Sequence, residues 1–397
     1  FPVCREIEKV KKNGEVVKIP EKYLIGTLVQ EYCSSPYIEF LPFPITKKPD
    51  DSKSFNLFRG YNAKLVEKVD MNLVQPIIDH IKYMWCSANP LLNVDPDTLI
   101  YNCNSDDEIN LLMFHTIMTY FKHIFWKPHL KTTKILALYG AQGIGKNVIT
   151  NVLVKICDMY GVTTDFTKIV QKHNTMIANK KLIVCNEVKS VDERGSNHDI
   201  MKGRISEEYQ TVEPKGIDPI QVRDFTEYIL LSNNVNCTII EMGDRRTLMP
   251  TMASKPKSKE YYKKLVEICN HEDTPSHLVT YLKDYQTKVD IVAHDSVVKT
   301  SVYKKVQKMS MDPALSFFKN IQESREDFLA ELHNENKELE ICYLFSENHL
   351  TICEKQMYEF YTQFCKNEGR YVQKKDTLLA KLEDYSKIER LAGNKRV

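Results

Sequence analysis

The sequence predicts an α/β protein with a largely parallel sheet, preceded and followed by helical regions. Three short apolar runs are typical of buried strands: ILALY at 135–139, LIVC at 182–185 and YILL at 228–231. Stretches with apolar residues at helical spacing lie between them, such as NVITNVLVKICDMYG at 147–161. Because alternating strands and helices favour parallel pairing, we expect the carboxyl ends of the strands to share one edge of the sheet.

The chain divides by composition into four parts. Residues 1–54 mix basic and proline-containing pieces and predict an irregular extension with one short helix near Lys22–Tyr32. Residues 55–130 carry apolar residues at helical spacing and predict a helical region that ends at Pro128. Residues 131–300 hold the predicted sheet, and residues 301–397 predict a small helical domain.

The charge balance and the cysteine spacing bear on which classes of protein the chain could belong to. The 397 residues include 55 basic and 53 acidic ones, a balance that neither indicates nor excludes a nucleic-acid partner. The 11 cysteines form no CxxC pair, which favours a reducing intracellular compartment over a disulfide framework. A possible zinc set, Cys342, His349, Cys353 and Cys365, has a spacing that matches no common zinc site.

Targeting and membrane signals are not visible in the sequence. It contains no apolar run of about 18 residues, so we expect no transmembrane helix and no membrane partner. No signal peptide is visible either. The chain opens at Phe1 without a methionine, and we expect it to be a fragment of a longer protein.

A glycine-rich stretch follows the first apolar run. Residues 139–147, YGAQGIGKN, fit the pattern Gly-x-x-x-x-Gly-Lys, with Asn147 where Ser or Thr is usual. Glycines let backbone N–H groups point at phosphate oxygens, and the following helix adds its positive end. The residues expected to hold ATP are Gly140, Ala141, Gln142, Gly143, Ile144, Gly145, Lys146 and Asn147. A purely structural turn is the alternative.

Polar residues end the second and third apolar runs. Glu187 follows the second run and is a candidate for activating water and organising Mg²⁺, a metal role it would share with Asn147. Asn233 follows the third run, and its amide suits a hydrogen bond to water and to the γ-phosphate. A solvated strand-end acid and an ordinary turn asparagine are the alternatives.

Two further pieces lie between 209 and 246. Two β-prone segments flank PKGID and predict a hairpin with Lys215 and Gly216 at its tip, suited to a phosphate backbone. Arg245 and Arg246 lie beyond the third strand, where they could stabilise charge on a neighbouring subunit's γ-phosphate. An edge lysine and a surface ion pair with Asp244 are the alternatives.

The order of these pieces resembles the superfamily 3 helicases of DNA viruses, phages and plasmids. GAQGIGKN, KKLIVCNEV, EPKGIDP, ILLSNN and GDRR look like motifs A, B, B-prime, C and the arginine finger of that group. FNLFRGYNAK at 55–64 and FWKP at 125–128 are similar to segments of the helicase part of poxvirus-type and phage primase-helicases. The resemblance is strong over 131–250, weaker over 55–130 and 311–397, and absent over 1–54.

The resemblance implies an AAA+ type P-loop ATPase core, a helical oligomerisation region over 55–130 and a winged-helix-like domain over 301–397. It implies a homo-oligomeric ring, usually a hexamer, with ATP and Mg²⁺ between subunits and single-stranded DNA of a replication fork in the channel. Lys215 and Gly216 would contact the strand, and a primase domain would precede the chain. The host cytoplasm or a viral replication site is the implied location, with the nucleus as an alternative.

Two departures and two other functions stay open. Asn186 replaces one acid of motif B, so Glu187 carries more of the Mg²⁺ role, and Asn147 replaces the usual hydroxyl residue. A P-loop nucleotide kinase or other phosphotransferase would not need Asn233 or the Lys215 hairpin. A non-catalytic, ATP-dependent DNA-binding assembly module would work without hydrolysis.

Overall fold

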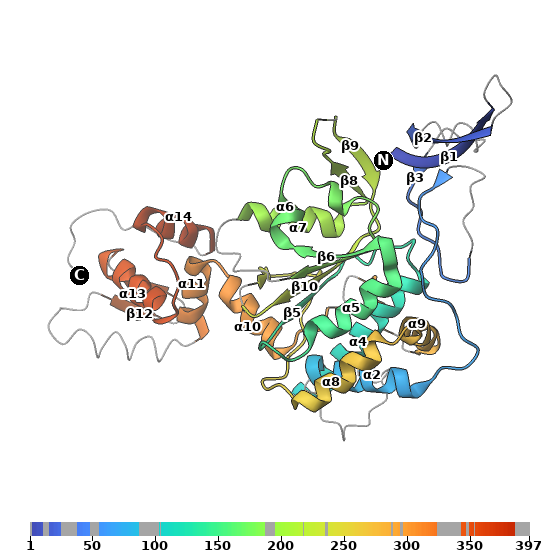
Figure 1. The fold of residues 1–397 in the computed structure, drawn as a ribbon. Coiled ribbons are helices and arrows are strands. Elements are labelled where there is room, and N and C mark those ends of the chain that lie inside the picture. Colours follow the sequence, from blue (N-terminus) through green and yellow to red (C-terminus); the bar gives the residue numbers. More distant parts are fainter. Residues whose placement is uncertain are drawn as a thin grey trace. The chain divides into compact units, whose positions relative to one another are not determined.

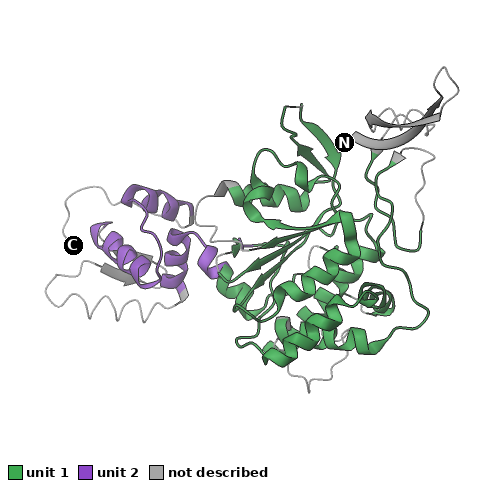
Figure 2. Ribbon diagram, viewed as in Figure 1, with its two compact units in different colours: residues 1–239, 243–306 green, residues 240–242, 307–397 purple. Residues whose placement is uncertain are grey.

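The computed structural model describes most of the chain as two compact units (Figures 1 and 2). The described residues are 2–10, 16–24, 38–47, 55–86, 103, 105–186, 195–216, 218–234, 237–286, 289–293, 297–323, 343–346, 349–352 and 354–385. Unit 1 comprises residues 1–239 and 243–306, and unit 2 comprises residues 240–242 and 307–397. The predicted boundaries at 54, 130 and 300 stay predictions.

The N-terminal segment forms a hairpin where the sequence analysis expected irregular chain. Strand β1 (Pro2–Val10) pairs antiparallel with β2 (Val16–Leu24). Val and Ile recur in both segments, and Asn13-Gly14 between them is a dipeptide typical of tight hairpins. The expected helix near Lys22–Tyr32 was wrong at its start, which belongs to β2, and its remainder lies outside the described residues.

An aromatic segment anchors the chain before the first helix. Strand β3 (Ile38–Glu39) pairs in parallel with β4 (Phe55–Asn56). Phe58 is fully buried and packs edge-on against Phe43, with ring centroids 4.9 Å apart. The Tyr160 hydroxyl accepts a hydrogen bond from the Arg59 N–H at 2.8 Å and so ties this segment to unit 1. The FNLFRGYNAK segment is therefore held by packing and by backbone hydrogen bonds.

A parallel sheet forms the centre of unit 1. Within the described residues its strand order is β11-β5-β10-β7-β6, and every neighbouring pair is parallel. The bounds are β5 (Ile135–Tyr139), β6 (Gly161–Asp165), β7 (Leu182–Asn186), β10 (Glu227–Ser232) and β11 (Thr247–Leu248). The structure confirms the three apolar runs as β5, β7 and β10, and the α/β class with a mostly parallel sheet.

Strands β6 and β11 were not predicted from the sequence, because neither has the composition of a buried strand. The β6 segment reads GVTTD, and only one of its five residues is buried. The β11 segment contains two residues, which is too short for a periodic pattern. Both strands form because a neighbouring strand, β7 for β6 and β5 for β11, offers a backbone partner.

Helices pack on both sides of the sheet (Figure 1). The helices beside the large core are α2 (Met71–Cys86), α4 (Asp106–Trp126), α5 (Lys146–Cys157), α8 (Lys259–Asn270) and α9 (Thr274–Asp284). On the other side lie α6 (Phe166–Val170) and α7 (Gly195–Ser206). Short helices η1 (Asp158–Tyr160) and η2 (Thr175–Ile177) connect elements of this unit, and α10 (Ser301–Ser310) follows α9.

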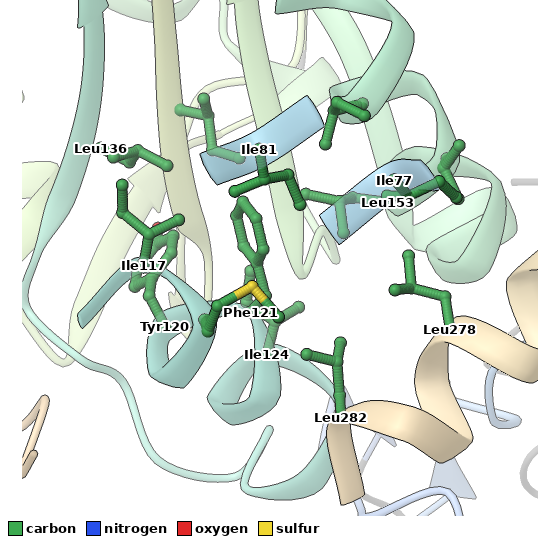
Figure 3. Packing of buried hydrophobic residues seen from close by; sticks show 14 of the residues in the cluster. Ile77, Ile81, Ile117, Tyr120, Phe121, Ile124, Leu136, Leu153, Leu278 and Leu282 are labelled. Atoms are coloured by element: carbon green, nitrogen blue, oxygen red, sulfur yellow. The ribbon is translucent and has the colours of Figure 1, made fainter. Parts of the chain in front are cut away.

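The main hydrophobic core joins the predicted helical region to the sheet (Figure 3). Ile81 of α2, Phe121 of α4, Leu136 of β5, Leu153 of α5 and Leu282 of α9 are buried together in it. Fully burying one such side chain contributes about 1.5–3 kcal/mol relative to leaving it exposed. Helices α2 and α4 are therefore part of the same folded body as the parallel sheet.

The second unit has its own small core. Its helices are α11 (Pro313–Glu323), α13 (Glu354–Asn367) and α14 (Lys375–Tyr385), and strands β12 (Tyr343–Ser346) and β13 (His349–Ile352) pair antiparallel. Phe317, Tyr361 and Leu378 are buried together. Gln373 and Lys381 both donate hydrogen bonds to the Asp312 carboxylate. The winged-helix assignment of this unit stays a prediction.

Candidate functional site

The glycine-rich loop curls between the end of β5 and the start of α5. Gly143 and Gly145 have φ angles of 79° and 91°, in the left-handed region that favours glycine. A Cβ on Gly145 would also lie 2.5 Å from the His80 Nε2 atom. Lys146 is the first residue of α5, so the free N–H groups of that helix start at the loop. The loop therefore has the strand–loop–helix context that phosphate binding requires.

Lys146 is held inside the curl by oxygen acceptors. Its Nζ donates hydrogen bonds to the carbonyl oxygens of Gly140 at 2.6 Å and Ser232 at 3.1 Å. It also donates to the Asn233 side-chain Oδ1 at 2.7 Å. Burial lowers the pKa of Lys146 to about 8, because the charged ammonium loses contact with water. A phosphate oxygen arriving in the loop would supply the anionic partner that this ammonium lacks.

The strand order brings Asn233 to Lys146. Strand β10 pairs with both β5 and β7, so its carboxyl end lies between the phosphate loop and the end of β7. A cleft of about 410 Å³ opens there, lined by Gln142–Val148, Asn186, Leu231–Asn233 and Tyr262. Residues 142–147 of the predicted phosphate loop therefore line the cleft together with Asn233, whereas Gly140 and Ala141 do not line it.

Asn186 is a cleft residue that the sequence analysis treated only as a missing acid. It is the last residue of β7, and its Oδ1 atom is buried. Within the described part of the chain, that oxygen has no hydrogen-bond partner. An unpaired buried amide oxygen costs free energy of about 1–3 kcal/mol, which a ligand or an ordered water would recover. Its position after a buried apolar run was the signal available in the sequence.

Helices α2 and α8 supply a wall that the sequence gave no reason to expect. His80 of α2 is fully buried, and burial followed by the charge of Lys257 lowers its pKa to about 4. Its Nδ1 lies 3.0 Å from the Tyr261 hydroxyl oxygen. The Tyr262 ring stands edge-on to the His80 ring and lines the cleft. The two helices therefore pack directly against the phosphate loop, and no sequence motif signals this.

Among the described residues, the other predicted site residues, Lys215, Gly216, Arg245 and Arg246, do not line this cleft. Glu187 lies outside the described residues, so its assignment stays a prediction. Arg245 and Arg246 precede β11, and the Ile135 N–H donates to the Arg246 carbonyl oxygen at 2.9 Å. Ile135 is the first residue of β5, whereas the phosphate loop follows its last residue. The arginine pair therefore lies at the amino end of the sheet, opposite its own phosphate loop.

The predicted hairpin is confirmed as β8 (Tyr209–Val212) paired antiparallel with β9 (Ile220–Arg223). Lys215 and Gly216 lie in the connection between these strands, and both are exposed. Gly216 has a φ of 76°, which a side chain would strain. The structure therefore presents Lys215 on a protruding turn.

No other metal or membrane feature emerges from the described residues. They contain no group of three or more His, Cys, Asp or Glu side chains that could hold a metal ion. Of the possible zinc set, Cys342 and Cys353 lie outside the described residues, and Cys365 is buried. Within the described part, no helix is both long and apolar enough to cross a membrane.

The comparisons with known proteins found a family of unknown function and a phage replication protein. A sequence profile of a family of unknown function (DUF5906) matches residues 138–246. The chain is similar to a phage DNA primase-polymerase. That protein, from Nitratiruptor phage NrS-1, is 27% identical over 193 residues, which are 45% of this chain and 26% of the phage protein. The match therefore spans about a quarter of the relative's length.

Solved structures share the fold. The apo structure of the NrS-1 C-terminal region (305–718) matches with a TM-score of 0.56 and 18% identity, covering 83% of this chain and 77% of that one. The A form apo structure of the same region matches with a TM-score of 0.55 and 17% identity, covering 89% and 80%. At this identity the likeness concerns the fold alone.

Proposed function

We propose that this chain is an ATP-hydrolysing DNA helicase motor of superfamily 3 with an AAA+ type core, acting in phage or viral DNA replication. One observation carries the proposal: the Lys146 ammonium and the Asn233 amide meet at 2.7 Å in the cleft of the phosphate loop. Lysine suits the β- and γ-phosphates, and the amide suits the γ-phosphate and its attacking water. A purely structural turn would not need the side-chain amide of a residue 87 positions away to meet this lysine.

The cleft residues also fit Mg²⁺. Asn186, whose buried Oδ1 has no partner within the described residues, and Asn147 both line the cleft, and amide oxygens suit this cation or its bound waters. When bound, Mg²⁺ would neutralise charge on the β- and γ-phosphates. Glu187, directly after Asn186, would accept the proton of the attacking water, as the sequence analysis proposed.

The arginine pair supports hydrolysis between subunits. Strand β5 (Ile135–Tyr139) rises about 3.3 Å per residue, so its two end residues lie roughly 13 Å apart. Arg246 is held beside Ile135 at the end remote from the phosphate loop. An arginine there serves the phosphate of a neighbouring subunit more readily than that of its own chain. This arrangement favours a ring of identical subunits, with a hexamer as the expected size.

The hairpin supports a polynucleotide track. Exposed Lys215 on a protruding turn suits a phosphate of single-stranded DNA in the ring channel, and Gly216 permits close approach of the backbone. The similarity to a phage DNA primase-polymerase supports a replication role and a primase domain elsewhere in the full protein. In this proposal, hydrolysis at one interface moves the hairpin along the strand.

ATPase assays with and without single-stranded DNA test the proposal. Lys146→Ala abolishes nucleotide binding, because the loop loses its only predicted ammonium. Asn233→Ala keeps binding and lowers hydrolysis by about 10²-fold or more, since it acts on the transition state. Asn234→Ala is the matched control, because Asn234 is an exposed neighbour that does not line the cleft. Glu187→Gln also binds ATP and loses hydrolysis.

The outcomes separate the competing functions. ATPase activity that single-stranded DNA stimulates, together with ATP-dependent unwinding, supports the helicase. Phosphate transfer to a nucleotide without DNA stimulation would identify a kinase. Normal function in Lys146→Ala would identify a non-catalytic assembly module.

A further inference from the structure

The loop that carries the arginine pair is fixed on several sides. The Asp244 carboxylate accepts a hydrogen bond from the Thr247 N–H at 3.0 Å, and the buried Tyr303 hydroxyl donates to the Asp244 carbonyl oxygen at 3.2 Å. The buried Lys134 ammonium donates to the Arg245 carbonyl oxygen at 2.7 Å. The backbone of this loop is therefore positioned before any ligand arrives, which is the condition for electrostatic catalysis.

The two arginine side chains have different surroundings. Arg245 is exposed, and its guanidinium has no hydrogen bond or ion pair within the described residues. Arg246 is partly buried, and its Nε donates to the Ser206 Oγ at 2.7 Å. It also lines a small cavity beside α7 with Met201 and Ile205. Arg245 is therefore available to another molecule, whereas Arg246 is engaged within its own chain.

Ser206 is the last residue of α7, directly before the hairpin. The Lys131 ammonium donates to the Glu207 carbonyl oxygen at 2.9 Å and pairs with the Asp224 carboxylate. Lys131 therefore joins the segment between α7 and β8 to the residue after β9. The Arg204 guanidinium donates to the Gln210 side chain at 3.0 Å. The end of α7 and the root of the hairpin are thus one connected structure.

We propose that the two arginines have separate roles, an inference that rests on the proposed function. Arg245 contacts the γ-phosphate held by a neighbouring subunit. Arg246 is a positioning residue that connects the arginine loop to the end of α7 and so to the root of hairpin β8–β9. Through this connection, the occupancy of the neighbour's site biases the position of the DNA hairpin in the subunit that supplies Arg245.

A chain of contacts is not by itself evidence of coupling. The Arg246–Ser206 hydrogen bond is exposed, and its loss alone has a small effect on stability. The test therefore needs a readout that a merely structural bond would not move. That readout is the ratio of DNA-stimulated to basal ATPase activity, measured on the full 397-residue chain.

We expect Arg245→Ala to keep ATP affinity and to lower basal and stimulated hydrolysis together by about 10³-fold or more. Ser206→Ala keeps basal hydrolysis within about threefold and loses most of the DNA stimulation, with the ratio falling at least about tenfold. The ratio in Arg246→Ala falls as in Ser206→Ala. Ser301→Ala is the matched control, because it removes another exposed side-chain hydrogen bond, to Thr251, and leaves the ratio unchanged.

A mixing experiment tests the role of Arg245 between subunits. Arg245→Ala and Lys146→Ala subunits are each inactive alone. In a random equimolar ring, about a quarter of the interfaces pair an intact phosphate loop with an intact arginine from the next subunit. We expect ATPase activity to reappear in that mixture. No recovery in a mixture that forms mixed rings would overturn the assignment of Arg245.

The remaining outcomes distinguish this inference from the function on which it rests. A ratio unchanged in Ser206→Ala would refute the coupling role of Arg246 and leave the helicase proposal standing. Equal loss of basal hydrolysis in Arg245→Ala and Arg246→Ala would refute the division of roles. Absence of DNA-stimulated ATPase activity in the unaltered chain would overturn both proposals.

Discussion

A buried ion pair beneath the site offers the sharpest test of the described packing. The side chains of Lys181 and Glu227 are 0% and 1% exposed, and their Nζ and Oε1 atoms lie 3.3 Å apart. Lys181 also donates to the Phe225 carbonyl oxygen at 2.8 Å, and Glu227 accepts the Thr132 N–H at 2.9 Å. Burial lowers the pKa of Lys181, and the charge of Glu227 opposes that shift. The pair therefore joins the starts of β7 and β10.

Lys181→Met is expected to lower the free energy of unfolding by about 3–5 kcal/mol, because it leaves the Glu227 carboxylate buried without a cation. Glu227→Gln added to that variant removes the stranded charge and keeps an amide oxygen for the Thr132 N–H. The double variant should therefore be more stable than the sum of the two single effects by about 2 kcal/mol.

Urea denaturation, monitored by far-UV circular dichroism, measures these free energies for the unaltered protein, Lys181→Met, Glu227→Gln and the double variant. Lys172→Met is the matched control, because the Lys172 side chain is 78% exposed and its ion pair with Glu213 spans 3.8 Å. We expect the control to change stability by no more than about 0.5 kcal/mol. A Lys181→Met effect as small as that of the control would refute the burial of this pair, and strict additivity would refute the coupling.

Three further predictions concern the loop, its lysine and a helix start. Gly145→Ala should lower ATP-analogue affinity at least about tenfold, because Gly145 has a φ of 91° and an added Cβ would lie 2.5 Å from the His80 Nε2 atom. Gly216→Ala, which strains φ alone, should leave the affinity unchanged. Equal affinities of the two variants would contradict this prediction. Burial lowers the Lys146 pKa to about 8, so the free chain loses this ammonium above pH 8 while the phosphates require it. The dissociation constant of an ATP analogue should rise about tenfold per pH unit above pH 8, and calorimetry should detect proton uptake on binding. A dissociation constant that stays flat from pH 7 to 9.5 would exclude the lowered pKa. Ser105→Ala should cost about 1 kcal/mol in urea denaturation by removing the capping box of α4, and no change would contradict that cap.

Features that depend on residues adjacent in the chain could be predicted from the sequence. The phosphate loop, the apolar strands β5, β7 and β10, and the hairpin around Lys215 each depend on residues adjacent in the chain. Glycine torsion freedom, strand composition and turn preference act over a few residues, so a single sequence carries them. The N-terminal hairpin was missed although Asn13-Gly14 was a visible signal.

Features that depend on tertiary packing could not be predicted from the sequence. The sequence does not predict that His80 of α2 lies beside Gly145, because this proximity arises from burying α2 and α5 in one core. Nor did the sequence reveal that Asn186 lines the cleft and has a buried Oδ1 atom without a hydrogen-bond partner within the described residues. Weakly apolar strands such as β6 form only because a neighbouring strand supplies hydrogen-bond partners.

The sequence by itself determined the glycine-rich loop, the strand that precedes it and the residues that end the neighbouring strands, because short-range backbone preferences fix those elements. Only the tertiary structure decided that β10 lies between β5 and β7, which brings Asn233 within 2.7 Å of Lys146. It alone also decided that Arg245 and Arg246 lie at the opposite end of β5. Strand order reflects the long-range burial of apolar faces, and no local pattern encodes which strands become neighbours.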